Sequence, residues 1–229
     1  MKKLVALFLL CLVASIAYGQ STFTIKPTVD PSTLTCATTI GSDTVTSNKL
    51  FGGVTAGIRI IGDDIPFGST VISKIDSSTI IISNDADSTH ASVALQLGVF
   101  QSHAYAAGDA MGFPFAIPTM RNLKQIVVID DAKQITSVDI VFFNNTFVET
   151  ADSAAFAISD ADAEKLVGYI TVGGTGANKA LANNTVMVLP FTTLPPQFSN
   201  TGKMYAQLIA VGTPTFTAID NLTIKFIYE

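Results

Sequence analysis

From Ser21 to the C-terminus, the sequence is a series of short apolar segments separated by turn residues. The segments are rich in Val, Ile and Thr, and the separators are mostly Gly, Pro, Asp and Asn. Such segments favour β-strands, because β-branched side chains pack well on a pleated sheet. Only 14% of the 229 residues are charged, whereas about 25% is typical of soluble domains. We therefore expect an all-β fold whose strands pair in antiparallel fashion across turns.

The first 19 residues have the features of a signal peptide. Lys2 and Lys3 precede a continuous apolar run, residues 4–16, which is shorter than the ~20 residues of a membrane span. Cleavage after Gly19 would leave Gln20 first; an uncleaved anchor or a buried terminal strand is the alternative. Removing Lys2 and Lys3 from the 13 basic residues leaves 11 against 18 acidic residues, a net charge of −7. We expect an exported or extracellular protein that is not inserted in a membrane after cleavage.

The pattern divides the remaining chain into two blocks. Residues 20–100 are expected to form a small β-module, and residues 101–229 a larger, β-sandwich-like domain with one short helix. In the first block, strands are expected at 56–61, 70–75, 79–83 and 91–99, with a hairpin turn at 76–78. In the second block they are expected at 126–131, 138–143, 169–172, 186–191, 204–211 and 222–228. The helix is expected to begin after the N-cap Ser159 and to end at Gly168.

The residue types used for catalysis and metal binding are scarce in this sequence. The only two histidines, His90 and His103, have no second ligand at zinc-binding spacing. Cys36, the one cysteine outside the leader, is expected to be a buried small side chain, with a reactive thiol as the alternative. With no Trp and only three Glu, the chain does not resemble a glycosidase, and it has no G-x-S-x-G motif.

Two further patterns partly match the sequence motifs of phosphate-binding and calcium-binding loops but do not meet their requirements. Residues 173–179 (GGTGANK) fail the register of a phosphate-binding loop, because Ala180 follows the lysine. The acidic pairs Asp63-Asp64, Asp85/Asp87, Asp130-Asp131 and Asp160/Asp162 supply too few oxygens for a calcium loop, and a weak calcium site is the alternative. No Lys/Arg cluster follows the leader, so no nucleic-acid partner is expected. We predict a non-enzymatic protein with no catalytic, cofactor-binding or metal-binding residues.

Both blocks resemble known families. Residues 53–58 (GVTAGI), 65–71 (IPFGSTV) and 82–86 (ISNDA) resemble a small β-module of phage virion proteins and bacterial surface proteins. Residues 105–112 (YAAGDAMG), 155–168 (AFAISDADAEKLVG) and 205–216 (YAQLIAVGTPTF) are similar to a group of tailed-bacteriophage virion proteins. The resemblance implies a structural component of a viral particle surface, as a capsid decoration or a head or tail fibre. Its partners would be capsid or other particle proteins. The alternative is a bacterial secreted, adhesin-like surface protein that binds a host-surface glycan or protein.

Low charge also predicts self-association. A chain with so few charges must place apolar side chains on outer sheet faces, which a symmetric partner would cover. Residues 79–83 are one expected open edge, since they contain no charge. We expect a homo-oligomer with closed, ring-like symmetry, and the viral resemblance implies a trimer.

Overall fold

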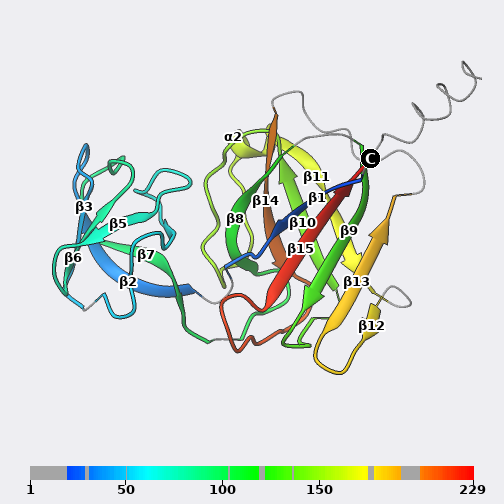
Figure 1. Ribbon diagram of the computed structural model, residues 1–229. Helices are drawn as coiled ribbons and strands as arrows, with labels where there is room; N and C mark the ends of the chain where they lie inside the picture. Colours follow the sequence, from blue (N-terminus) through cyan, green and yellow to red (C-terminus); the bar gives the residue numbers. More distant parts are fainter. Residues whose placement is uncertain are drawn as a thin grey trace, which may run out of the picture.

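The computed structural model describes residues 20–28, 31–49, 51–102, 104–118, 122–135, 137–174, 178–191 and 202–229. The predicted leader and His103 lie outside the described residues. The described chain forms three β-sheets and one short helix, and the strands within each sheet pair antiparallel (Figure 1). The all-β prediction is therefore confirmed. Among the described residues, no helix combines the length and the apolar character needed to cross a membrane.

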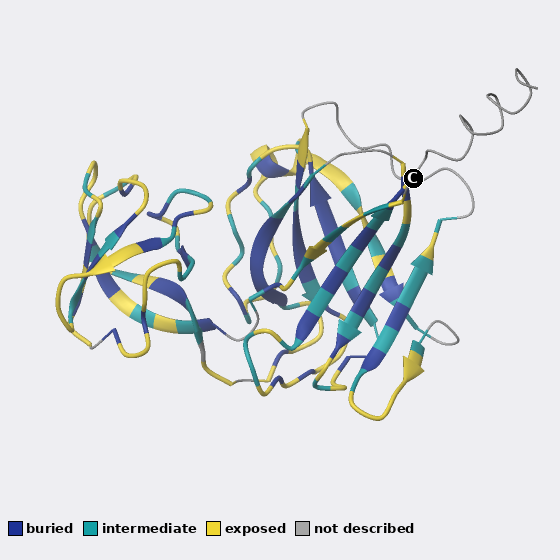
Figure 2. Ribbon diagram, viewed as in Figure 1, coloured by how far each residue is buried: buried dark blue, intermediate teal, exposed yellow. Residues whose placement is uncertain are grey.

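Two of the sheets face each other and form a β-sandwich. The five-stranded sheet has the order β1 (Ser21–Ile25), β15 (Leu222–Tyr228), β9 (Leu123–Asp130), β13 (Thr185–Pro190), β12 (Asn178–Ala180). The four-stranded sheet has the order β11 (Leu166–Gly173), β10 (Ser137–Phe143), β14 (Lys203–Ala210), β8 (Ala110–Pro118). Alternate residues of each strand enter the core between the sheets, as the regular change in burial along β15 shows (Figure 2). Ile140, Phe142, Ile224 and Phe226 belong to this core.

The first strand belongs to the sandwich, whereas the predicted boundary assigned residues 20–100 to the small module. β1 pairs with β15 along its whole length, with Phe23 opposite Phe226 and the two ring centroids 6.2 Å apart. The alternation of Phe23 and Ile25 indicates which face of the strand is buried, but it contains no information on the partner sheet. The small module is therefore an insertion between β1 and β8 of the sandwich.

The inserted module is a six-stranded curled sheet. Its order is β4 (Ile60–Ile61), β7 (His90–Phe100), β2 (Pro31–Thr38), β3 (Thr44–Ser47), β6 (Thr79–Ile82), β5 (Val71–Lys74). The two ends of the sheet meet: Val71 N donates to Ile58 O, and Gly57 N to Val71 O, both at 2.8 Å. We call β2–β7 the curled-sheet module and the rest of the described fold the sandwich.

The strand order and a turn of the module change two expectations about the first block. β6 lies between β3 and β5, so the predicted open edge at residues 79–83 is wrong. The predicted strand at residues 56–61 is reduced to Ile60–Ile61, because Gly57 has a positive φ of 88° and the chain turns there. The hairpin of β5 and β6 is as expected. Cys36 is buried in the module's core, as predicted, and burial raises the pKa of its thiol to about 11.

The short helix begins where the sequence predicts and ends earlier. In α2 (Asp160–Ala163), the Ser159 Oγ accepts a hydrogen bond from Asp162 N at 3.1 Å. The expected end was Gly168, but the chain enters β11 at Leu166, and Gly168 pairs with Phe142 at a β-bulge. Pairing with β10 therefore ends the helix before the glycine is reached.

Candidate functional site

The buried Asp64 carboxylate organises a polar cluster in the curled-sheet module. It accepts hydrogen bonds from Ser88 at 2.5 Å and Thr38 at 2.8 Å, and lies 2.6 Å from His90 Nδ1. Ser88 Oγ is 3.5 Å from the same His90 nitrogen. In a catalytic triad the acid and the serine contact opposite nitrogens of the imidazole. Here both contact Nδ1 and Ser88 donates to Asp64, so the cluster has the arrangement of a structural network.

Asp64 gives a prediction about acid stability. Burial raises the pKa of Asp64, but the hydrogen bonds from Ser88, Thr38 and His90 outweigh it and hold the pKa below its usual 3.8. Because the folded-state pKa is depressed, this stabilisation is present above pH ~4 and is lost as the pH falls through the folded value. We expect Asp64→Ala to lower the unfolding free energy by about 2 kcal/mol at pH 7, and less at pH 2–3.

Urea denaturation at both pH values measures this effect. The exposed neighbour Asp63 is the matched control, and Asp63→Ala should leave stability within about 0.5 kcal/mol of the wild type. Equal losses for the two variants at pH 7 would contradict a structural role of Asp64.

Two of the other acidic pairs each contribute one carboxylate to local structure. Asp130 Oδ2 accepts from Ile135 N at 2.8 Å and from Gln134 N at 2.5 Å, so it holds the turn after β9. Asp162 binds Lys165 Nζ at 2.7 Å and accepts a hydrogen bond from the N-cap Ser159 Oγ at 2.9 Å. Within the described ranges, no group of three His, Cys, Asp or Glu side chains is arranged to hold a metal ion.

Of the glycine-rich loop, residues 175–177 lie outside the described chain, and Lys179 belongs to β12.

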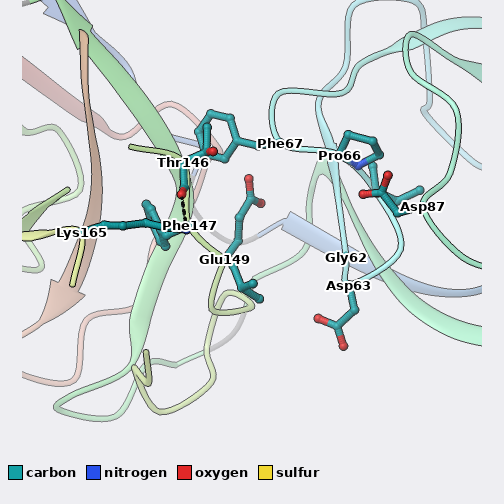
Figure 3. A pocket seen from close by; sticks show the side chains of 11 residues that line it. Gly62, Asp63, Pro66, Phe67, Asp87, Thr146, Phe147, Glu149 and Lys165 are labelled. Atoms are coloured by element: carbon teal, nitrogen blue, oxygen red, sulfur yellow. Dashed lines mark hydrogen bonds between the residues drawn. The ribbon is translucent and has the colours of Figure 1, made fainter. Parts of the chain in front are cut away.

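A cavity lies between the curled-sheet module and the sandwich. Its volume is about 270 Å³, and both modules line it (Figure 3). Phe67, in the segment between β4 and β5, lies edge-on to Tyr205 of β14, with centroids 5.1 Å apart and planes at 89°. It also approaches Phe147 at 6.5 Å. The two modules therefore share an aromatic contact at one wall of the cavity.

An ion pair crosses the same interface. Arg59 Nη2 of the curled-sheet module lies 3.2 Å from Glu149 Oε1 of the sandwich, and the two side chains are 21% and 12% exposed. Arg59 Nη1 also donates to Pro114 O. The guanidinium carbon is 4.9 Å from the Phe67 ring centroid and 5.7 Å from that of Phe113. Arg59 is thus held by a charge, a carbonyl and two aromatic faces of the interface.

The pair is incompletely satisfied. Arg59 Nε and Glu149 Oε2 are buried and have no hydrogen-bond partner. Burial raises the pKa of Glu149 to about 7, against the opposing effect of Arg59, and burial also lowers the pKa of Arg59. Keeping a buried carboxylate ionised costs free energy when one of its oxygens has no hydrogen-bond donor. Glu149 therefore changes charge near neutral pH.

A second polar contact joins the modules through Asp152. Its backbone N donates to Gln96 Oε1 of β7 at 2.8 Å, and Gln96 Nε2 donates to Asp152 O at 3.2 Å. The Asp152 carboxylate accepts from Tyr105 Oη at 2.6 Å and from Gly112 N. Gln96 alternates with the core residues Leu95 and Leu97 of β7, yet it is also buried, because its own face of the strand contacts the sandwich.

Sequence reasoning did not identify Arg59 or Glu149 as site residues. A signal for Arg59 was available, since it stands alone among apolar residues in Ile58-Arg59-Ile60-Ile61. A charge that becomes buried among such residues needs a partner. Glu149 has no comparable signal, because it lies in an irregular segment and meets Arg59 only through the packing of the two modules.

The outer edge of the sandwich at β11 has different properties. β11 ends its sheet and pairs only with β10 among the described strands, and its sequence LVGYITVG contains no charge. Leu166, Val167 and Tyr169 are 41%, 39% and 69% exposed. Beside them, a groove of about 270 Å³ is lined by Asp139 and the apolar side chains of Val141, Phe156, Ile158, Leu166, Tyr169 and Ile209. We call β11 and this groove the β11 surface.

The other sheet edges in the described chain are short, joined or covered. β12 has three residues and contains Lys179, and β1 has five. Two other segments of the chain cover the edge of β8. Phe113 N donates to Thr28 O at 3.0 Å, and Ala110 N donates to Ala154 O at 2.8 Å. The ends of the curled sheet bind each other. β11 is therefore the long described edge without the charges, prolines or covering segments that prevent edge-to-edge pairing.

Comparisons with known proteins found no match to a family model, to a curated protein or to a solved structure.

Proposed function

We propose that the protein is a non-enzymatic structural component of a viral particle surface, of the capsid-decoration or fibre type, which assembles through the β11 surface. The observation that carries this proposal is the exposed, charge-free edge of β11 beside an apolar groove. The resemblance to virion proteins supports a role on a viral particle, and the open edge of β11 supports assembly with another chain.

A second copy of the chain is the partner that fits this edge. The unpaired N–H and C=O groups of a strand edge are satisfied best by another strand. Two identical edges can pair antiparallel across a two-fold axis, which presents the same surface on both copies. Such pairing would bring Tyr169 and Leu166 of each copy to the interface. A trimeric ring needs β11 to pair with a different edge, and the other described edges are short, joined or covered. The geometry therefore favours a two-fold pair over the expected trimer.

Sedimentation equilibrium of the chain beginning at Gln20, at micromolar concentration, tests this proposal. We expect the wild type to dimerise and Tyr169→Lys to weaken dimerisation by about 100-fold or more, because each copy would place a charge without an opposite partner in a charge-free edge. Ile75→Lys is the control, since Ile75 is similarly exposed, at 62%, but lies in the turn between β5 and β6. It should dimerise like the wild type. A monomeric wild type, or dimerisation unchanged in Tyr169→Lys, would refute assembly through β11.

The second candidate is an exported, adhesin-like surface protein of a bacterium. The predicted leader favours it, because a cleavable signal peptide directs export. In that case the groove of the β11 surface would bind a host-surface glycan or protein in a monomeric chain. A monomeric wild type that binds a host-cell surface, with binding lost in Tyr169→Lys and retained in Ile75→Lys, would favour this candidate over the particle component.

A further inference from the structure

We propose that the Arg59–Glu149 contact is a proton-controlled device, in which uptake of a proton by Glu149 tightens the docking of the curled-sheet module on the sandwich. The inference is independent of the proposed assembly through β11, because it concerns the interface within one chain.

The topology allows the two modules to separate without unfolding. The chain passes between them twice, once between β1 and β2 and once between β7 and β8, and each module has a hydrophobic core of its own. Their docking depends on a small set of contacts. Those described above are the contacts of Arg59 with Glu149, Pro114 O and Phe113, the two hydrogen bonds between Gln96 and Asp152, and the packing of Phe67 on Tyr205 and Phe147.

The charges around Glu149 make its ionised form costly in the docked state. Arg59 is its ion-pair partner at 3.2 Å. From the curled-sheet module, Asp63 and Asp87 line the same cavity and add negative charge (Figure 3). From the sandwich, Lys165 also lines the cavity, but its ammonium is bound by Asp162 at 2.7 Å and by Thr146 O at 2.9 Å. Asp152, three residues along the chain, is turned to Tyr105.

Arg59 keeps its other contacts when Glu149 is protonated. The guanidinium keeps its hydrogen bond to Pro114 O and its position over the Phe67 and Phe113 rings. The neutral carboxyl loses the desolvation penalty of the charge, because a neutral group costs far less to bury. The docked interface therefore accommodates the protonated form better than the ionised form.

The sign of the pH effect follows from linkage. Burial raises the pKa of Glu149 to about 7 in the docked form, whereas a carboxyl exposed by separation returns toward its ordinary value of 4.5. The docked form thus binds more protons between these two values. Docking is strongest below pH ~4.5, weakens as the pH rises through ~7 and is constant above it. The docking equilibrium should change by a factor on the order of 100 across this range.

Amide hydrogen exchange at Asp152 measures docking directly, because this N–H binds Gln96 across the interface at 2.8 Å. Protection factors are taken between pH 5 and pH 8 in the EX2 regime, after correction for intrinsic exchange. We expect the wild-type protection of this amide to fall about 100-fold from pH 5 to pH 8. Glu149→Gln imitates the protonated carboxyl and should keep high protection at both pH values.

Matched controls separate docking from folding. Glu164→Gln removes an exposed carboxyl at the end of α2 and should keep the wild-type pH dependence. Amides of β10 in the sandwich core report global stability in every variant. Arg59→Gln removes the opposing charge, so its pH transition should move to higher pH. A wild-type Asp152 amide whose protection does not change with pH, or the same pH dependence in Glu149→Gln, would overturn the proposal.

Discussion

Replacing Phe226 with alanine is expected to lower the free energy of unfolding of the sandwich by about 3–5 kcal/mol. Phe226 is completely buried between the two sheets. Its ring lies 6.2 Å from that of Phe23 on β1 and 6.5 Å from that of Phe115 on the facing sheet. The substitution removes a large side chain from the core between the two sheets. It leaves a cavity that a shift of one sheet alone cannot fill. Urea denaturation followed by far-UV circular dichroism measures the loss.

The control for this prediction is a phenylalanine outside the sandwich core. Phe67 contacts Phe147 and Tyr205 at the module interface and is only partly buried. Phe67→Ala should therefore cost the sandwich less than about 1 kcal/mol, because partly exposed side chains lose less on truncation. A loss below 1 kcal/mol for Phe226→Ala would show that the packing of β1 and β15 over the core is not as described.

The second large effect is expected at Asp152. Asp152→Ala removes the carboxylate that accepts hydrogen bonds from Tyr105 Oη and Gly112 N. Asp152 is 5% exposed and Tyr105 is 1% exposed. Hydrogen bonds to a charged group contribute about 1.5–3 kcal/mol each, and the donors would stay buried. We expect a loss of about 3–4 kcal/mol in the free energy of unfolding, measured by thermal and urea denaturation.

Asp109→Ala is the matched substitution. Asp109 also accepts a backbone hydrogen bond, from Ala106 N at 2.7 Å, but in an exposed turn where water can replace it. Its loss should be about 1 kcal/mol or less. If the two variants were equally stable, the Asp152 network would contribute nothing beyond an ordinary turn contact.

Strand positions were largely predictable, because alternation of apolar residues reflects local burial. Residues 222–228 and the hairpin around 76–78 are examples. Partner choice was not predictable, since Phe23 and Ile25 alternate in the same way whichever sheet they join. The predicted edge at 79–83 was wrong for the same reason, because the pairing of β6 with β3 joins residues far apart in the sequence, such as Thr79 and Thr46.

The candidate site was less predictable than the fold. Arg59 and Glu149 are 90 residues apart and meet only because two modules dock. A pairing of this kind has no periodicity that a single sequence can display. The exposed edge at β11 is different, since its lack of charge is visible in the sequence. What the sequence did not show is that β11 is the end strand of its sheet, which depends on the order of all four strands.

The pairing of β1 with β15 also determines how the molecule responds to mechanical force. Ser21 lies opposite Tyr228, so the two chain ends of the described fold meet at one end of the sandwich. Because the strands are antiparallel, tension applied between these two residues separates them one hydrogen bond at a time, in an unzipping geometry. The curled-sheet module follows β1 in the chain, so it carries no load until β1 has been removed. A molecule held at both of these ends would therefore release its first strand before its inserted module experiences any tension.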